Sequence, residues 1–291
     1  MVKNVQFESN NPMTEVVLES SMVDGREQKF RQVLVTDDTG VRHQVASVTQ
    51  NYSLITNQVI HDAAVDVMSR SDREFEWLKT FWDGKRFIEY HRTTQPIVDG
   101  GLHMGVMFKN SYDGSSLAML SIFILNAGCL NMYHSGSLFG SFEMRHSGDN
   151  SFDNRSIDDS LRNLQTGAES CIRIAPRIEE LKRESIDVDD VVKAKQRKLI
   201  PDARWPDVID ALATEDRTQF GLFQSLTNVA THKLSDWHGH KHREACTEYF
   251  LTLAEGEETA TEKYYDKQHF GDEQLGHGNI NAHPLHPDER N

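Results

Sequence analysis

Residues 110–131 read Asn110-Ser-Tyr-Asp-Gly-Ser-Ser-Leu-Ala-Met-Leu-Ser-Ile-Phe-Ile-Leu-Asn-Ala-Gly-Cys-Leu-Asn131, and this stretch decides the fold class. From Leu117 to Leu125 both sets of alternate residues are apolar, and only Ser121 interrupts the run. A strand that is apolar on both faces must be covered on both faces. The stretch therefore predicts a buried strand inside a sheet, with other parts of the chain packed above and below it.

A tight turn precedes this strand, and a polar segment follows it. Asp113-Gly114 is a turn pair, because glycine tolerates a positive φ and aspartate hydrogen-bonds to its own backbone. The polar residues at the two ends of such a rigid element are candidates for a functional site, although the same residues also suit a simple hairpin turn. They are Asn110, Tyr112, Asp113, Ser115 and Asn131.

The composition is that of a globular protein without a membrane segment. The 291 residues are 37% hydrophobic and include 4 Trp and 14 Phe, enough to form a sizeable core. Ser121 and Asn126 interrupt the longest apolar run well short of the ~20 residues that a membrane helix needs. The 3 cysteines have no CxxC spacing, so we predict neither a disulfide framework nor a thiolate metal site. No signal-like segment opens the chain, and we expect a cytoplasmic protein.

The net charge of −14 argues against a surface that is basic throughout. Residues 254–291 hold nine acidic and three basic residues, which makes them an acidic, histidine-rich tail. A nucleic-acid function would therefore need a local cationic groove.

The first half of the chain, residues 14–150, predicts strands and one helix. Phe75, Trp77 and Phe81 alternate on one predicted face, and Asp83-Gly84 forms a hairpin turn. Asn57 is the expected N-cap of the helix. The predicted strands are 15–18, 31–36, 43–52, 74–81, 86–92, a strand beginning at 104, the central strand and 138–146, and the helix is 58–70.

The second half, residues 151–253, changes to helical periodicity. Apolar residues spaced by threes and fours predict a helix over 157–181, with a kink or break at Pro176. A helix capped near Asp216 follows, and residues 237–242 are expected to be a histidine-rich turn. Further helices are predicted over 189–198, 205–213, 220–234 and 244–253.

These patterns predict an α+β fold in one domain over residues 14–253. A twisted, mostly antiparallel sheet carries a helix across it and is followed by a helical half that packs on the other face. Residues 1–13 are predicted to be a flexible N-terminus, and residues 254–291 a disordered acidic tail that cannot bury enough surface to fold.

Four separated segments resemble one known family. The chain is similar to the phage/plasmid-like proteins, a domain family of unknown function found on tailed phages and mobile plasmids, over roughly Val45 to Leu253. The resemblance implies a shared fold and an origin in a mobile element, with the protein acting in the host bacterial cytoplasm during infection, but it supplies no reaction. The four segments are Val48–Tyr52 leading into Asn57, Lys109–Gly114 with Cys129–Asn131, Arg145–Gly148 and Leu222–His232.

The chain also departs from the family pattern at two positions. The family usually carries an arginine three residues before the cysteine and a glycine just after the asparagine. Asn126 and Met132 occupy these positions here. If that arginine contacts an anion in other members, the contact is absent or displaced in this chain.

Cationic and aromatic side chains on the predicted hairpins suggest a groove for single-stranded nucleic acid. Cations would neutralise phosphates and tyrosines would stack on bases, although ordinary surface charge with half-buried aromatics is the competing interpretation. With the resemblance, this predicts a DNA-metabolism protein that binds single strands without base specificity and anneals them in recombination. The candidate binding residues are Arg86, Tyr90, Arg92, Lys109, Tyr112, Asn131, Tyr133, Arg145 and His146.

Two other functions compete with nucleic-acid binding. A metal-dependent enzyme acting on phosphodiesters would use Asp113, Asn131, His134 or His146, but the sequence holds no complete catalytic pattern, and we predict neither a cofactor nor a bound metal. The third function is capture of a host factor through the acidic surface. The histidine-rich segment could also bind a metal, because His238, His240 and His242 would share one side of an extended chain, with His232 nearby. However, no carboxylate or cysteine completes a recognised metal-binding spacing there.

The predicted partners follow from these interpretations. We expect a homo-oligomer, since annealing proteins work as assemblies, and we expect no contact with a membrane. The acidic tail is predicted to compete with nucleic acid for the groove and also to recruit a host or phage replication partner, and a solubilising tail without a partner is the competing interpretation. The sequence does not distinguish DNA from RNA.

Overall fold

The structure is a computed structural model that describes residues 11–97, 101–146 and 154–252. The chain divides into two units, Met1–Leu253 and Ala254–Asn291, and all described residues belong to the first. The predictions for residues 1–10 and for the tail lie outside the described residues.

Six antiparallel strands form the larger of two sheets. Every residue from Ala118 to Leu125 is buried, so the prediction of a central strand covered on both faces is confirmed. All the strand pairs in this sheet are antiparallel. The order is β4 (Phe75–Trp82), β5 (Arg86–Thr93), β6 (Leu102–Ser111), β7 (Ala118–Asn126) and β8 (Asn131–His134), and β9 (Ser141–Met144) also pairs with β7.

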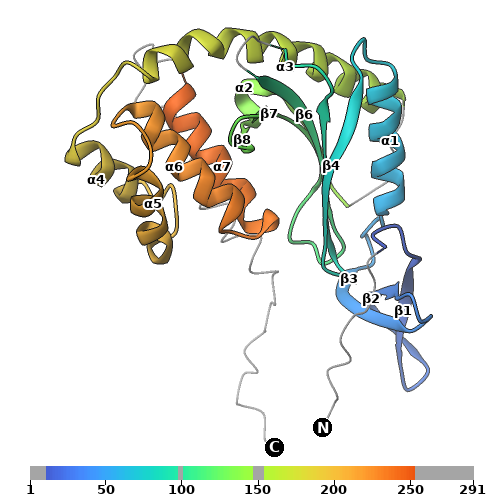
Figure 1. Ribbon diagram of the computed structural model, residues 1–291. Helices are drawn as coiled ribbons and strands as arrows, with labels where there is room; N and C mark the ends of the chain where they lie inside the picture. Colours follow the sequence, from blue (N-terminus) through green and yellow to red (C-terminus); the bar gives the residue numbers. More distant parts are fainter. Residues whose placement is uncertain (1–10, 98–100, 147–153, 253–291) are drawn as a thin grey trace, which may run out of the picture. The chain divides into compact units, whose positions relative to one another are not determined.

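Helices cover both faces of this sheet (Figure 1). Helices α1 (Asn57–Ser69) and α3 (Asn154–Leu181) pack on one face, which we call the α1 face. On the other, the α7 face, α7 (Asp236–Leu251) packs against β5 and β8, and α6 (Gln219–His232) lies beside it. The α7 face is lined by Ile88, Tyr90, Met107, Met119, Phe123, Leu125 and Met132.

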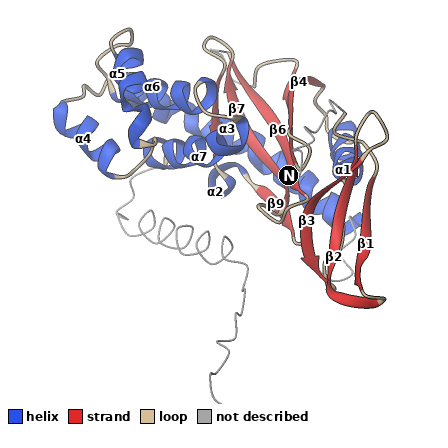
Figure 2. Ribbon diagram, turned by 90° about the horizontal axis from the view of Figure 1, so that it is seen from below, coloured by secondary structure: helices blue, strands red, loops and turns tan. Residues whose placement is uncertain are grey.

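The first three strands form a separate antiparallel sheet (Figure 2). They are β1 (Val16–Val23), β2 (Arg26–Thr36) and β3 (Arg42–Thr49). Val33 and Val35 of this sheet pack against Tyr112 and Trp82 of the larger one, so a shared apolar cluster joins the two. The remaining elements are α2 (Gly136–Phe139), α4 (Val188–Gln196), a short 3-10 helix (Asp202–Arg204) and α5 (Trp205–Leu212).

Two predicted helix caps are one or two residues out of place. The Thr56 side chain accepts a hydrogen bond from Val59 N and is the N-cap of α1, whereas Asn57 is the first, buried residue of the helix. Thr218 rather than Asp216 caps α6, through a hydrogen bond from Gly221 N. In both cases a threonine supplies the capping oxygen, one residue before the expected cap in α1 and two residues after it in α6.

Two predicted elements differ more. Residues 138–146 are not one strand, because Ser135 caps the short helix α2 before the chain turns at Gly140 into β9. Helix α3 continues through Pro176 without a break. The missing proline N–H leaves the carbonyl of Ile172 without a helical donor, and this residue is exposed, so water can replace the lost bond.

The predicted face of β4 is also wrong. The pairing with β5 shifts between Trp77 and Lys79, so Trp77 lies opposite His91 while Phe81 lies opposite Ile88. One extra residue at this bulge reverses which face the following side chains occupy. As a result, Lys79 lies on the α7 face.

The histidine-rich segment is helical, which overturns the prediction of a turn or an extended strand. It forms the beginning of α7. His238, His240 and His242 are two residues apart, and residues at that spacing fall on nearly opposite sides of a helix. Gly239 is needed there because an added Cβ would lie 2.2 Å from Ala230 O of α6. The glycine therefore serves close helix packing rather than a turn.

The fold class is confirmed as α+β, with antiparallel sheets followed by a helical half. None of the helices in the described part of the chain combines the length and hydrophobicity required to span a bilayer.

Candidate functional site

The structure buries the tyrosines assigned to the predicted groove. Tyr90 and Tyr133 are 0% exposed, and Tyr112 is 1% exposed. Side chains with no accessible surface do not stack on a base, so the prediction that these three residues line an open groove is wrong. They are core residues whose hydroxyl groups make internal hydrogen bonds.

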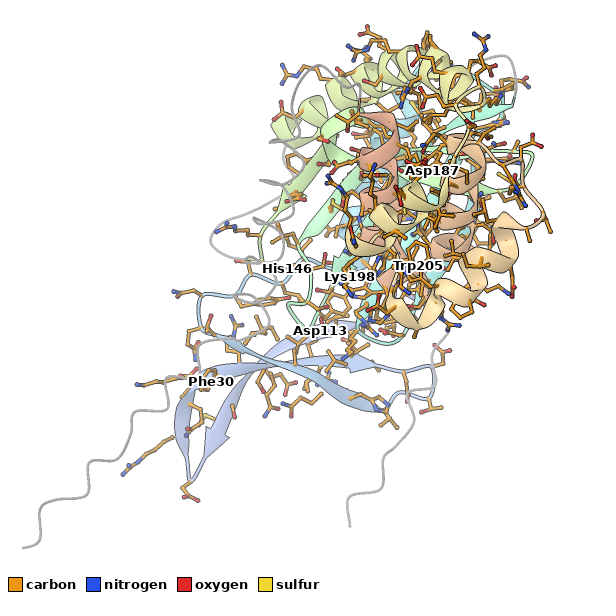
Figure 3. All side chains as sticks on the ribbon, turned by 90° about the vertical axis from the view of Figure 1, so that its left-hand side faces the viewer. Phe30, Asp113, His146, Asp187, Lys198 and Trp205 are labelled. Carbon is orange, nitrogen blue, oxygen red and sulfur yellow. The ribbon has the colours of Figure 1, made fainter. Side chains whose placement is uncertain are left out.

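Tyr112 holds the junction between the two sheets. Its hydroxyl accepts a hydrogen bond of 2.9 Å from Asn57 N at the start of α1. Asn110 Nδ2 donates to Asn57 Oδ1 at 2.8 Å. His146 stacks on Tyr52 with ring centroids 5.1 Å apart, and Figure 3 labels it near Asp113 at this junction. Asn110, Tyr112 and His146, which belong to the segments that resemble the family, therefore stabilise the junction between the two sheets.

Asn131 and Tyr133 belong to a second internal network, which joins β8 to α6. Asn131 Nδ2 donates to Gln224 Oε1 at 2.5 Å, and Gln224 Nε2 donates to the Tyr133 hydroxyl at 2.6 Å. Cys129 Sγ also donates to Gln224 Oε1, at 3.2 Å. Burial raises the pKa of the Cys129 thiol, which keeps it protonated and unreactive.

The residues of the enzyme alternative do not meet in one site. Asp113 Oδ2 lies 3.1 Å from Lys85 Nζ at the turn after β6. Asn131 is held by Gln224, and His146 stacks on Tyr52 at the sheet junction. His134 is buried on the α7 face, so these four side chains have separate surroundings.

Two of the predicted cations converge on a residue that the sequence did not single out. The Lys109 ammonium lies 4.4 Å from the Trp237 ring centroid, and the Arg86 guanidinium lies 5.3 Å from it. By contrast, Arg92 Nε donates to Glu76 at 2.7 Å, and Arg145 is exposed at the end of β9.

We call Lys79, Arg86, Lys109, Trp237 and Asp236 the Trp237 cluster. Lys79 Nζ donates to Asp236 Oδ1 and lies 5.0 Å from the centre of the Tyr90 ring. Arg86 Nε donates to Asp83 at 2.7 Å. Trp237 and the three cations are all partly exposed, so the cluster is reachable from solvent.

A buried group of basic residues adjoins this cluster. We call Tyr90, His134, His240 and Arg243 the buried basic core. Arg243 is 0% exposed and donates to the Tyr90 hydroxyl at 2.8 Å and to Ala230 O at 3.2 Å. The His134 and His240 rings meet edge to face with centroids 4.9 Å apart.

Four nitrogens of the buried basic core have no hydrogen-bond partner among the described residues. They are both ring nitrogens of His134, Nδ1 of His240 and Nε of Arg243. Burial, followed by the nearby Arg243 charge, holds the pKa of His134 well below its usual value, and burial with Lys109 and Arg243 does the same for His240. Both rings are therefore neutral at neutral pH.

The remaining histidines of the metal hypothesis lie apart from one another. The His242 Nδ1 makes a 2.9 Å hydrogen bond with Leu199 O, and burial lowers its pKa to about 4. His238 is exposed beside the N-cap Ser235, and His232 is exposed at the end of α6. Within the ranges that the structure describes, no three His, Cys, Asp or Glu side chains are grouped to hold a metal ion.

The α1 face carries polar groups whose partners are present. Glu89 is buried, and its Oε1 contacts His91 Nε2 at 2.5 Å and His61 Nδ1 at 3.1 Å.

A pocket of about 360 Å³ also opens between the end of α1 and α3, next to Arg70 and Arg73. Arg70 is held by Asp66 at 2.7 Å, so its charge is already paired.

Sequence reasoning missed Trp237, Lys79 and Arg243 for different reasons. Trp237 was assigned to a turn, Lys79 is moved to the α7 face by the bulge, and Arg243 is separated from Tyr90 by more than half the chain. One signal was present in the sequence, namely an arginine on the apolar side of a helix that also carries Cys246 and Phe250.

Comparison with known proteins adds a family but no activity. No curated protein and no solved structure matches the chain. Residues 44–255, which include both the Trp237 cluster and the buried basic core, match the family described as "Domain of unknown function (DUF932)", and the chain belongs to that family.

Proposed function

We propose that the protein binds single-stranded nucleic acid without base specificity, through the Trp237 cluster. The observation that carries this proposal is the partly exposed Trp237 indole with Lys109 4.4 Å and Arg86 5.3 Å from its ring centroid. An aromatic ring can stack on any base, and adjacent cations neutralise the phosphates beside it.

The local charge supports the same function in a protein whose net charge is −14. Lys79, Arg86 and Lys109 are the cations at the surface, and Arg243 lies buried behind them. Asp83 and Asp236 offset Arg86 and Lys79. The gathering of four cations in this small region favours a polyanion at this place and not over the whole surface.

The proposed site keeps Arg86 and Lys109 from the predicted groove and replaces its tyrosines by Trp237. In the biological context suggested by the resemblance to phage and plasmid proteins, such binding would serve strand annealing in recombination within the bacterial cytoplasm. An oligomer would place several Trp237 clusters along one strand and increase affinity through multivalency.

Fluorescence anisotropy with labelled single-stranded and duplex oligonucleotides tests the proposal. The full-length protein should prefer single strands, because a base must be free to stack on Trp237. Trp237→Ala should weaken binding by about 5- to 150-fold, the range expected for loss of one base-aromatic stack. Equal affinity of the wild type and this variant would remove Trp237 from the site.

Trp77→Ala is the matched control. Trp77 is 61% exposed on the edge strand β4 but lies on the α1 face, away from Lys109 and Arg86. Its replacement should leave affinity unchanged. A loss as large as that of Trp237→Ala would contradict a site restricted to the Trp237 cluster.

A further inference from the structure

We propose that the buried basic core receives a terminal phosphate group, of the kind carried by the end of a nucleic-acid strand or by a free mononucleotide. The proposal rests on the proposed function, because it makes the core the end-binding part of the same site. It is carried by the placement of His134, His240 and Arg243.

Arg243 is the first reason to expect an anion. A fully buried arginine is normally paired with a carboxylate, because an isolated charge is costly to remove from water. Here the guanidinium bonds to a tyrosine hydroxyl and two backbone carbonyls, those of Ala230 and Asp236. The Asp236 carboxylate is bound to Lys79 instead. Among the described residues, Arg243 Nε has no acceptor.

The two histidines are the second reason. His134 is 0% and His240 is 7% exposed, and three of their ring nitrogens lack partners within the described ranges. Buried polar groups in proteins are nearly always hydrogen-bonded, so several unsatisfied nitrogens at one place mark a position where a ligand or an ordered water can bind. Each neutral imidazole can donate from one of its ring nitrogens, and such donors beside an arginine and two lysines favour an acceptor with negative charge.

The surrounding charges define the class of ligand. Lys79 from β4, Lys109 from β6 and Arg243 from α7 all act electrostatically on His134. Phe123 stacks on the His134 ring with centroids 4.9 Å apart, and Tyr90 meets that ring edge to face at 6.1 Å. A phosphate accepts hydrogen bonds in several directions and carries the charge that these groups would neutralise.

Burial distinguishes a terminal phosphate from an internal one. An internal phosphodiester carries a nucleotide on each side, and both would have to enter the protein with it. A terminal phosphate has one attached nucleotide, whose base would stack on Trp237. The core itself is closed to solvent, so entry of the phosphate would require the partly exposed side chains next to it, Lys79, Lys109 and Trp237, to move aside.

Competition binding on the full-length protein tests the proposal. The same oligothymidylate is prepared with a 5′-phosphate, with a 3′-phosphate and with hydroxyl groups at both ends, and thymidine monophosphate is the small-molecule probe. At least one phosphorylated end should bind about tenfold tighter than the unphosphorylated strand, the gain expected from new charge-assisted hydrogen bonds. Equal binding of all three strands, together with no binding of thymidine monophosphate, would overturn the proposal while leaving strand binding intact.

Substitutions in the buried basic core test whether the core causes any preference for a phosphorylated end. His134→Gln and His240→Gln should lose the preference for the phosphorylated end, measured within each variant as the ratio of its affinities for the phosphorylated and unphosphorylated strands. His242→Gln, on the same helix but bonded to Leu199 O, is the matched control and should keep the preference. A preference that survives both core substitutions would place the phosphate elsewhere and overturn the assignment.

The comparison of strands within the wild type does not depend on how the variants fold. Failure of every strand to bind would remove the proposed function and this inference together. Tight binding of thymidine monophosphate with no difference between the strands would show that the core selects a free nucleotide, and the strand-end assignment would be overturned.

Discussion

The two faces of the large sheet treat their buried polar groups differently. On the α1 face, Glu89 is buried together with His61 and His91, and each imidazole has the carboxylate as a partner. On the α7 face, His134 and His240 are buried beside a fully buried arginine without such a partner among the described residues. Burial alone therefore does not indicate a site. The informative feature is a buried polar group whose bonding capacity is unused.

The largest effect expected from this difference is a loss of stability in acid. His134 and His240 have lowered pKa values in the folded protein, whereas in the unfolded chain they titrate near the ordinary value. Their stabilising contribution is therefore present above pH ~6.5 and is lost as the pH falls below it. Denaturant unfolding at several pH values should show a loss of at most about 4 kcal/mol between pH ~6.5 and ~5 from these two residues.

His134→Gln provides the check on that assignment. Glutamine does not titrate in this range, so the variant should lose roughly half of the acid sensitivity that the two histidines supply. A variant whose stability falls with pH as steeply as the wild type would show that other groups cause the acid sensitivity.

The packing that creates the α7 face can be broken at Gly239. An added Cβ would lie 2.2 Å from Ala230 O and 2.9 Å from Arg243 Nη1, so α6 and α7 would have to separate. We expect Gly239→Ala to lower the free energy of unfolding by about 3 kcal/mol, measured by chemical denaturation.

Gly114→Ala is the matched control for that substitution. Gly114 has a φ of +73° in the turn after β6, but nothing lies within 4 Å of an added Cβ. The cost should be limited to backbone strain of about 1 kcal/mol. A larger loss at Gly114 than at Gly239 would contradict the assignment of close packing to the α6 and α7 pair.

The buried contacts of the α1 face can be tested by replacing Glu89, the carboxylate that both His61 and His91 contact. Glu89→Gln should cost about 2 kcal/mol in thermal or chemical unfolding, because a neutral amide replaces the carboxylate that two histidines contact. Single-strand affinity should not change, since this face is on the opposite side of the sheet from Trp237. A loss of affinity with unchanged stability would move the binding site to the α1 face.

The smallest expected effect is a difference in the salt dependence of binding between substitutions of two arginines in β5, Arg86 and Arg92. Arg86 lies near Trp237, whereas Arg92 is engaged with Glu76. Arg86→Ala should reduce the slope of log affinity against log salt by about 0.7, the value for one phosphate contact on a single strand. Arg92→Ala should leave the slope unchanged, and equal changes in both variants would favour the broader groove predicted from the sequence.

Local patterns predicted the fold well where neighbours along the chain decide the structure. The two-sided apolar run of β7 and the turn at Gly114 needed only alternation and glycine chemistry. The bulge after Trp77 was not visible, because it depends on how β4 pairs with β5. The histidine-rich helix was missed because Gly239 resembles a turn residue until its contact with α6 is known.

The site was harder to predict than the fold, for a physical reason. The Trp237 cluster joins side chains from β4, β5, β6 and α7, and the sequence does not indicate which distant residues share a face. Arg86 and Lys109 were selected for positive charge on a hairpin and both lie near Trp237, whereas the tyrosines were selected for aromatic character alone. Burial decides between a stacking surface and a core residue, and it is fixed by tertiary packing.

The most direct test of the central claim, that the α7 face is the ligand-binding face, is quenching of tryptophan fluorescence by a single-stranded oligonucleotide. Trp237 should report the contact, while Trp77 lies on the other face and Trp205 is buried at the start of α5. We expect quenching in the wild type and in Trp77→Phe, and its loss in Trp237→Phe. Quenching that persists in Trp237→Phe and disappears in Trp77→Phe would contradict the account.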